Sequence, residues 1–547
     1  MKNYNPEELN IINEKRNFLL SLRKKRINTK LKESRFKYLK KNNENQEINK
    51  KDNNNEQEQE QDKKNPLIVN IKFKFDELLS DKANTEEKYL LILQELIDNI
   101  SIFVKNYKSK TISEPLIESN VIEKIYNGLV VKKYINNKEI LNKLLVIYSC
   151  VVFIYNHFPH TNAFKKEFIS NIKYINLYIS LLDSKDDEEV IYNIYKFIGL
   201  LCHKSSEIMI KLYNEKIMDK IIDNNIFDGD IDIIKIKTWC ISLFDINIKF
   251  NENFNLSLKI QKYYFFVFYN FLNKYNCDIE LLENFMKVII NLSYCIDDEY
   301  INKLLNSNLL EFLLNSEINE NILEESILIV IGNMSCISNN SILSRLYIKS
   351  IPFLTDILKS NKHSKNIYNL SLWCINNFTY DENLCLDIFL QKNCLSIYKK
   401  FVDNETIDEN IFIEICIGFK NLIHAINNNT NIDNKYYSDI KEYNIMSCIV
   451  EGFKKLENIK NIYKIGQNVI EVIFLLLTFP NEEFTNFNKN IFEIKGGNEY
   501  IFDKIKFILL QQNNQNKKEQ INEINEEYNI LEFILFIQTH LLYYGIN

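Results

Sequence analysis

The most distinctive spacing in the sequence is that of Trp373 and Asn377, which stand four positions apart. Residues four apart lie one above the other on a helix face, so a helical segment would present the pair as a single ledge. An asparagine amide offers donors and an acceptor to a peptide backbone. An indole ring packs along the stem of a lysine or arginine and attracts its charge. The pair therefore predicts contact with an extended basic peptide.

No common catalytic motif accompanies this pair. The sequence contains no phosphate loop, no H-E-x-x-H and no G-x-S-x-G, and its only adjacent glycines are Gly496 and Gly497. The 11 cysteines stand singly without a C-x-x-C, a pattern typical of reduced thiols in an intracellular protein rather than of disulfides or a zinc site. We therefore expect a protein that is not an enzyme and that uses no cofactor or metal.

The frame around Asn377 recurs along the chain at spacings of 42, 44 and 44 residues. Each copy has an apolar residue two positions before the asparagine and another directly after it, and the asparagines are Asn291, Asn333, Asn377 and Asn421. The frame continues backward without asparagine at Leu243 and Gly199, and more weakly at Phe153. Four residues before three of these positions stand Tyr195, Trp239 and Trp373.

A period of 42 to 48 residues, combined with only 10 glycines and 6 prolines in 547 residues, predicts an all-α chain. The expected architecture is a right-handed armadillo-repeat superhelix, a solenoid over residues 67–547, in which a long third helix of each repeat lines a groove. For the repeat that ends near Asn333, the apolar pattern predicts three helices at 300–305, 309–316 and 322–336.

The asparagines also allow a second interpretation. The chain has 80 asparagines in total, and at this frame position the amide could instead hydrogen-bond the neighbouring repeat. That alternative remains open for Asn291, Asn333 and Asn421, because no aromatic residue stands four positions before them. No ledge is expected at Ser149 and Phe153.

The N-terminal region has a different composition. Residues 15–41 contain twelve basic residues and one acid, Glu33, although the chain as a whole has a net charge of −6. Residues 42–65 are almost entirely polar, which predicts a flexible linker. We therefore expect a basic arm at 1–41, a disordered linker at 42–66 and an acidic repeat body. Charge alone would also suit a nucleic-acid tail or a nuclear localisation signal.

Arm, linker and repeats together resemble the importin-α (karyopherin-α) family. The segment Trp373-Cys-Ile-Asn-Asn377 is similar to the W-x-[LI]-x-N motif of that family's repeats. The arm is similar to its importin-β-binding domain, in which an L-R-K-x-[KR] core follows a basic lead-in. The residues of this similarity are Lys15, Arg16, Leu22, Arg23, Lys24, Lys25, Arg26, Lys30, Leu31 and Arg35.

The resemblance implies a nuclear import adaptor, present in cytoplasm and nucleus, without direct binding to membrane or nucleic acid. Its arm would bind importin-β, and its groove would bind the basic nuclear localisation signals of cargo proteins. An export receptor at the C-terminal repeats is a further partner of the family and stays open here. The implied peptide-binding residues are Trp373, Asn377, Trp239, Tyr195, Asn291, Asn333 and Asn421.

A second function remains open, that of an armadillo scaffold in the cytoskeleton or in signalling whose arm binds acidic surfaces. The chemistry of the groove separates the two functions. An adaptor predicts acidic and aromatic side chains along the third helices, because these bind lysine and arginine. A scaffold predicts an apolar or mixed groove.

Overall fold

The computed structural model describes the chain in segments. They are residues 66–80, 83–106, 120–157, 167–168, 170–183, 187–203, 206–224, 230–243, 254–272, 278–293, 298–315, 321–337, 339–428, 440–456, 459 and 462–505. The predicted arm and linker lie outside these segments, except for Pro66, which begins the first described helix. All elements in the described segments are helical, which confirms the all-α solenoid. In them, no helix is long and apolar enough to cross a membrane.

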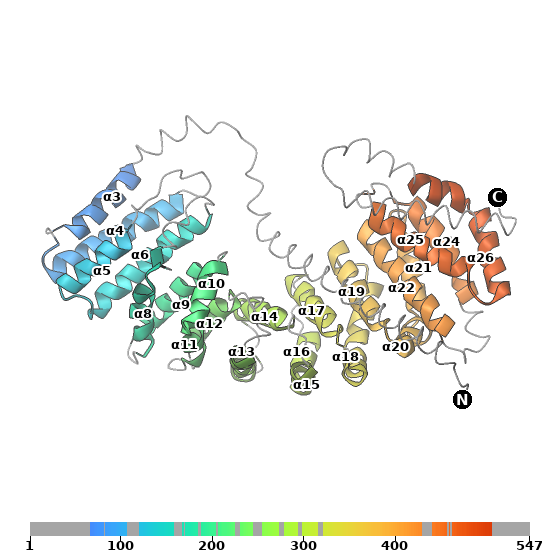
Figure 1. Ribbon diagram of the computed structural model, residues 1–547, viewed down its shortest axis with the longest axis horizontal. Helices are drawn as coiled ribbons and strands as arrows, with labels where there is room; N and C mark the ends of the chain where they lie inside the picture. The colour runs from blue at the N-terminus through green and yellow to red at the C-terminus, as the bar shows by residue number, and fades with distance from the viewer. Residues whose placement is uncertain are drawn as a thin grey trace. The chain divides into compact units, whose positions relative to one another are not determined.

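The chain divides after Cys295 into two compact units, each a row of helical repeats (Figure 1). In the first unit, the long helices that end successive repeats pack side by side in chain order. They are α4 (Glu86–Asn106), α6 (Lys138–His157), α9 (Glu188–Cys202), α12 (Ile231–Ser242) and α14 (Ile279–Ser293). The other elements of this unit are α3 (Pro66–Leu79), α5 (Val121–Val131), α8 (Ile172–Ile179), η1 (Ser180–Asp183), α10 (Ser206–Asn214), α11 (Ile217–Asp223), α13 (Phe254–Val267) and the π-helical turn η3 (Phe268–Leu272).

The second unit repeats the same construction. Its long helices are α17 (Asn321–Met334), α19 (Lys365–Phe378), α22 (Glu409–Asn428) and α25 (Ile462–Leu477), and each packs on the next. The remaining elements are α15 (Asp298–Asn306), α16 (Leu309–Asn315), α18 (Asn340–Lys359), α20 (Glu382–Leu386), η4 (Asp387–Gln391), α21 (Cys394–Asp403), α24 (Ile445–Lys454), α26 (Glu482–Ile494) and η5 (Asn498–Asp503). Helices α15, α16 and α17 lie where the sequence predicts the three helices of one repeat.

Helix α9 illustrates why the long helices form and where they are buried. The Asp187 side chain caps it by accepting a hydrogen bond from the Val190 backbone N–H at 3.2 Å. Acids follow in its first turn, at Glu188 and Glu189, where they complement the positive end of the helix dipole. Most of its remaining residues are buried, because α9 packs between α6 and α12. A single exposed strip of side chains is left.

Candidate functional site

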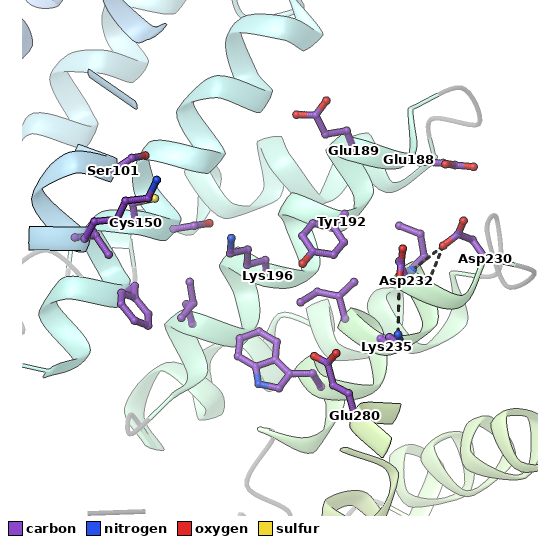
Figure 2. A pocket seen from close by; sticks show the side chains of 18 residues that line it. Ser101, Cys150, Glu188, Glu189, Tyr192, Lys196, Asp230, Asp232, Lys235 and Glu280 are labelled. Atoms are coloured by element: carbon purple, nitrogen blue, oxygen red, sulfur yellow. Dashed lines mark hydrogen bonds and ion pairs between the residues drawn. The ribbon is translucent and has the colours of Figure 1, made fainter. Parts of the chain in front are cut away.

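The first unit contains a cavity of about 1010 Å³ on the faces of its long helices (Figure 2). Its walls come from five helices and the residues at their ends. They are Ser101, Val104 and Lys105 of α4; Ser149, Cys150 and Phe153 of α6; Glu188, Glu189, Tyr192, Lys196 and Leu200 of α9; Asp230, Asp232, Ile233, Lys235, Ile236 and Trp239 of α12 and its cap; and Glu280 of α14. We call this cavity the unit 1 groove.

Five carboxylates gather where α9, α12 and α14 begin. Glu188 and Glu189 lie in the first turn of α9, Asp230 caps α12, Asp232 follows it, and Glu280 lies in the first turn of α14. Part of this placement serves the helices themselves. The Asp230 side chain accepts from the backbone N–H groups of Asp232 and Ile233, at 2.8 and 3.0 Å.

Some of these carboxylates already have partners. Lys235 Nζ lies 2.5 Å from Asp278 Oδ2 and 3.7 Å from Asp232 Oδ1, and its hydrogen bond to Asp278 raises its pKa. Glu189 Oε1 accepts a hydrogen bond from Asn142 Nδ2 at 3.0 Å. Glu188 and Glu280 are exposed. The beginnings of the helices therefore carry an excess of negative charge over the single lysine among them.

Three aromatic side chains also line the groove. Phe153 is 41% exposed and Tyr192 is 36% exposed, whereas Trp239 is half-buried. The indole of Trp239 packs against Gly199 on α9. A Cβ atom built on that glycine would stand 2.3 Å from the indole Cζ3 atom. Glycine at 199 therefore allows the indole to sit in the groove wall.

The opposite side of the groove is basic. Lys105 lies in the last turn of α4, and Lys196 lies on α9 one helical turn after Tyr192. Figure 2 shows Lys196 between Cys150 and Tyr192. Burial raises the pKa of the Cys150 thiol, and the nearby Lys196 ammonium opposes that rise. The groove thus joins an acidic side, an aromatic middle and a basic side.

The sequence prediction for Trp373 and Asn377 is wrong about their exposure. Trp373 is only 3% exposed, and a Cβ atom built on Gly332 of α17 would stand 2.1 Å from its indole ring. Asn377 is 5% exposed, and its Nδ2 donates to the Gly332 carbonyl oxygen at 3.0 Å. The pair attaches α19 to the preceding repeat, which is the role that the sequence left open for the other asparagines of the frame. No exposed ledge exists at this position.

Asn333 and Asn421 are buried as well. Asn421 is buried, and its Nδ2 donates to Thr379 Oγ1 of the preceding repeat at 2.7 Å. Asn333 is 1% exposed. The side chain of Asn291 lies outside the described residues. The family resemblance implied peptide contact at Asn333 and Asn421, but both side chains lie inside the stack of helices and are not exposed to a peptide.

In the first unit, the expected residues divide. Trp239 lines the unit 1 groove. Tyr195 does not, because it is 1% exposed and its hydroxyl donates to Asn224 Oδ1 at 3.0 Å within the core. Ser149 and Phe153, where no ledge was expected, both line the groove.

Sequence reasoning missed Tyr192, Lys196 and the acids of the helix starts. A signal for the first two exists in the repeat frame, since they stand seven and three positions before Gly199. Tyr192 and Lys196 stand four residues apart and therefore share one face of a helix. The acids had a plainer signal, because each stands in the first turn or at the cap of a long helix.

The packing of Trp373 against Gly332 predicts how a substitution at Gly332 changes the free energy of unfolding. Replacing Gly332 with alanine places a methyl group inside the indole, so we expect destabilisation by about 1–3 kcal/mol through overpacking. Gly128→Ala is the matched control, because nothing lies within 4 Å of its Cβ position in helix α5. We expect the control to leave stability unchanged or to raise it by about 0.5–1 kcal/mol. Thermal unfolding followed by circular dichroism measures both. Superimposable curves for the two variants would contradict the contact.

Comparison with known protein families finds no matching family model and no matching curated protein. Among solved structures, an engineered protein described as Northeast Structural Genomics Consortium target OR497 superposes with a TM-score of 0.50 at 10% identity, over 77% of this chain and 99% of that one. A designed armadillo repeat protein in complex with the peptide (KR)4 gives a TM-score of 0.38 at 15% identity, over 45% of this chain and 99% of that one. Another designed armadillo repeat protein gives 0.29 at 13% identity, over 58% and 98%. The first likeness shows the helical-repeat fold alone, and the other two superpose too loosely to add to it.

Proposed function

We propose that the unit 1 groove binds an extended peptide with basic side chains, and that the chain serves as a nuclear import adaptor. One observation carries the proposal: five carboxylates and three aromatic side chains line one cavity on the long helices. Acidic side chains beside aromatic ones are what we expect in the groove of an adaptor. An apolar groove would instead be evidence for the scaffold function.

The groove supplies both parts of a site for lysine or arginine. The aliphatic stem of such a side chain packs on Phe153, Tyr192 or Trp239, and its charged end points towards the acids of α9, α12 and α14. Each cation–π contact contributes about 0.5–1 kcal/mol at an exposed site and about 2 kcal/mol when desolvated. Two or three such contacts together contribute about 1–6 kcal/mol, so the carboxylates and contacts to the peptide backbone must supply the rest of the roughly 8 kcal/mol that a micromolar Kd requires.

The partner side of the proposal rests on the arm and its family resemblance. The whole chain has five arginines, and four of them, Arg16, Arg23, Arg26 and Arg35, lie in the arm. Because the planar guanidinium group binds carboxylates in a bidentate manner, this concentration of arginine favours an acidic partner. We propose importin-β as that partner, basic nuclear localisation signals as the ligands of the groove, and a cytoplasmic and nuclear location.

Alkylation of Cys150 tests where a basic peptide binds. Cys150 lines the unit 1 groove, whereas Cys336, the other partly exposed cysteine among the described residues, lies in the second unit. A basic peptide at about ten times its Kd should slow Cys150 alkylation by about tenfold through mass action and leave Cys336 unchanged. Mass-spectrometric mapping separates the two thiols. Because burial raises the pKa of Cys150, its reaction should accelerate as the pH rises towards and beyond 9.

Two outcomes would contradict the proposal. Equal protection of both thiols would place the peptide elsewhere or show general coating of the surface. Equal protection of Cys150 by an uncharged peptide of the same length would favour the scaffold function, because the acids of the groove would then contribute nothing.

A further inference from the structure

The unit 1 groove is divided by charge. All five lining carboxylates come from the beginnings of α9, α12 and α14. Lys235 lies among them. The lining residues from α4 and α6 include no acid, and this side carries Lys105 and, from α9, Lys196. An extended chain that crosses the groove therefore meets negative charge on one side and positive charge on the other.

Lys196 differs from Lys235, another lysine that lines the groove. Lys235 is neutralised by Asp278 and Asp232. The Lys196 ammonium has no hydrogen bond or ion pair with any of the residues that the structure describes, although the side chain is half-buried between Cys150 and Tyr192. It also lies in the middle of α9, away from the helix C-terminus where a lysine would serve the helix dipole.

Lys105 has a local explanation that Lys196 lacks. It stands in the last turn of α4, where a positive charge stabilises the helix end. Its presence on the same side of the groove nevertheless adds to the positive potential around Lys196. A peptide with basic side chains alone would bring like charge to this side, which opposes binding. A peptide with an anionic side chain at this point would satisfy Lys196.

We propose that the groove selects a peptide of mixed charge, in which basic residues that meet the acids of α9, α12 and α14 are followed by an anionic side chain that pairs with Lys196. This inference rests on the proposed function and refines its ligand class. The shared chemistry of the anion is a carboxylate or a phosphate group, from glutamate, aspartate or a phosphorylated serine. Phosphate carries more charge and more acceptors than carboxylate, so phosphorylation next to a basic cluster would strengthen binding.

The test titrates three fluorescent peptides against the full chain. They share one basic sequence of about ten residues, an extended length of about 33 Å, and differ at one position that is glutamine, glutamate or phosphoserine. A position scan first moves the glutamate along the peptide to find its best register. We expect the glutamate peptide to bind roughly 3- to 10-fold more tightly than the glutamine peptide, and phosphoserine more tightly still, because charge-assisted hydrogen bonds exceed neutral ones.

Lys196→Gln should abolish this preference, so that the glutamate peptide no longer binds more tightly than the glutamine peptide. Lys211→Gln is the matched control, because Lys211 is a partly exposed lysine on α10 that is paired with Glu215 and does not line the groove. It should leave the preference intact. Equal thermal unfolding of the two variants shows that both are folded.

The outcomes separate this inference from the proposed function. If no basic peptide binds, the proposed function fails. If basic peptides bind but the glutamate peptide gains nothing at any register, the mixed-charge inference fails alone. A preference for glutamate that survives in Lys196→Gln would also overturn it, because another group would then hold the anion.

Discussion

Replacing Tyr192 and Trp239 together with alanine should weaken the binding of an extended basic peptide by roughly 10- to 100-fold, if each ring contributes about 1 kcal/mol or somewhat more. Both side chains line the unit 1 groove beside the acids of the helix starts. The alanine variant removes two surfaces for lysine stems and leaves the carboxylates in place. The loss should therefore appear mainly as faster dissociation, with the salt dependence of binding largely kept.

Single variants keep this experiment interpretable. Tyr192 is 36% exposed, so Tyr192→Ala should fold normally and lose a part of the affinity. Trp239→Ala removes the indole from its seat on Gly199, and its unfolding curve must be measured beside its affinity. Tyr192→Phe and Trp239→Phe retain a ring and should retain most of the binding.

Trp373→Ala provides the strongest control. It removes the other tryptophan of the chain, which is buried in the second unit against Gly332. We expect lower stability and unchanged peptide affinity. If Trp373→Ala weakens peptide binding as much as Tyr192→Ala and Trp239→Ala combined, the assignment of the site to the unit 1 groove is wrong.

The position of the long helices could be predicted from the sequence because burial determines it. An apolar residue two before and one after each frame position must face the neighbouring helices, so a spacing of 42 to 48 residues marks successive copies of one helix. The structure places Asn333 in α17, Asn377 in α19 and Asn421 in α22, each the long helix of its repeat.

The exposed face of those helices could not be predicted in the same way. Trp239 and Trp373 occupy the same frame position, and each lies on a glycine of the preceding long helix. Even so, Trp239 lines a groove while Trp373 is 3% exposed. Their exposure depends on side chains from other repeats that cover the indole, and spacing within one helix does not specify these. Asn377 likewise could serve a peptide or the Gly332 carbonyl, and only the packing decides between them.

Replacing Arg23, Lys24, Lys25 and Arg26 with alanine should weaken binding of the full chain to importin-β by at least about tenfold, and wild-type binding should fall steeply with salt. The reason is electrostatic, since twelve basic residues and one acid lie between positions 15 and 41. Surface plasmon resonance at low and half-molar salt measures both effects. Binding that is equally tight at half-molar salt would contradict the electrostatic explanation.

A charge-preserving variant asks whether the arm needs guanidinium groups. Changing the arm's four arginines, Arg16, Arg23, Arg26 and Arg35, to lysine keeps the net charge but removes the planar fork that binds carboxylates in a bidentate manner. We expect a loss intermediate between the wild type and the alanine variant. The unit 1 groove should bind its basic peptide normally in both variants, because all of its lining residues lie between Ser101 and Glu280. If the lysine variant bound importin-β as tightly as the wild type, charge alone would account for the arm, and the concentration of arginine in it would need another cause.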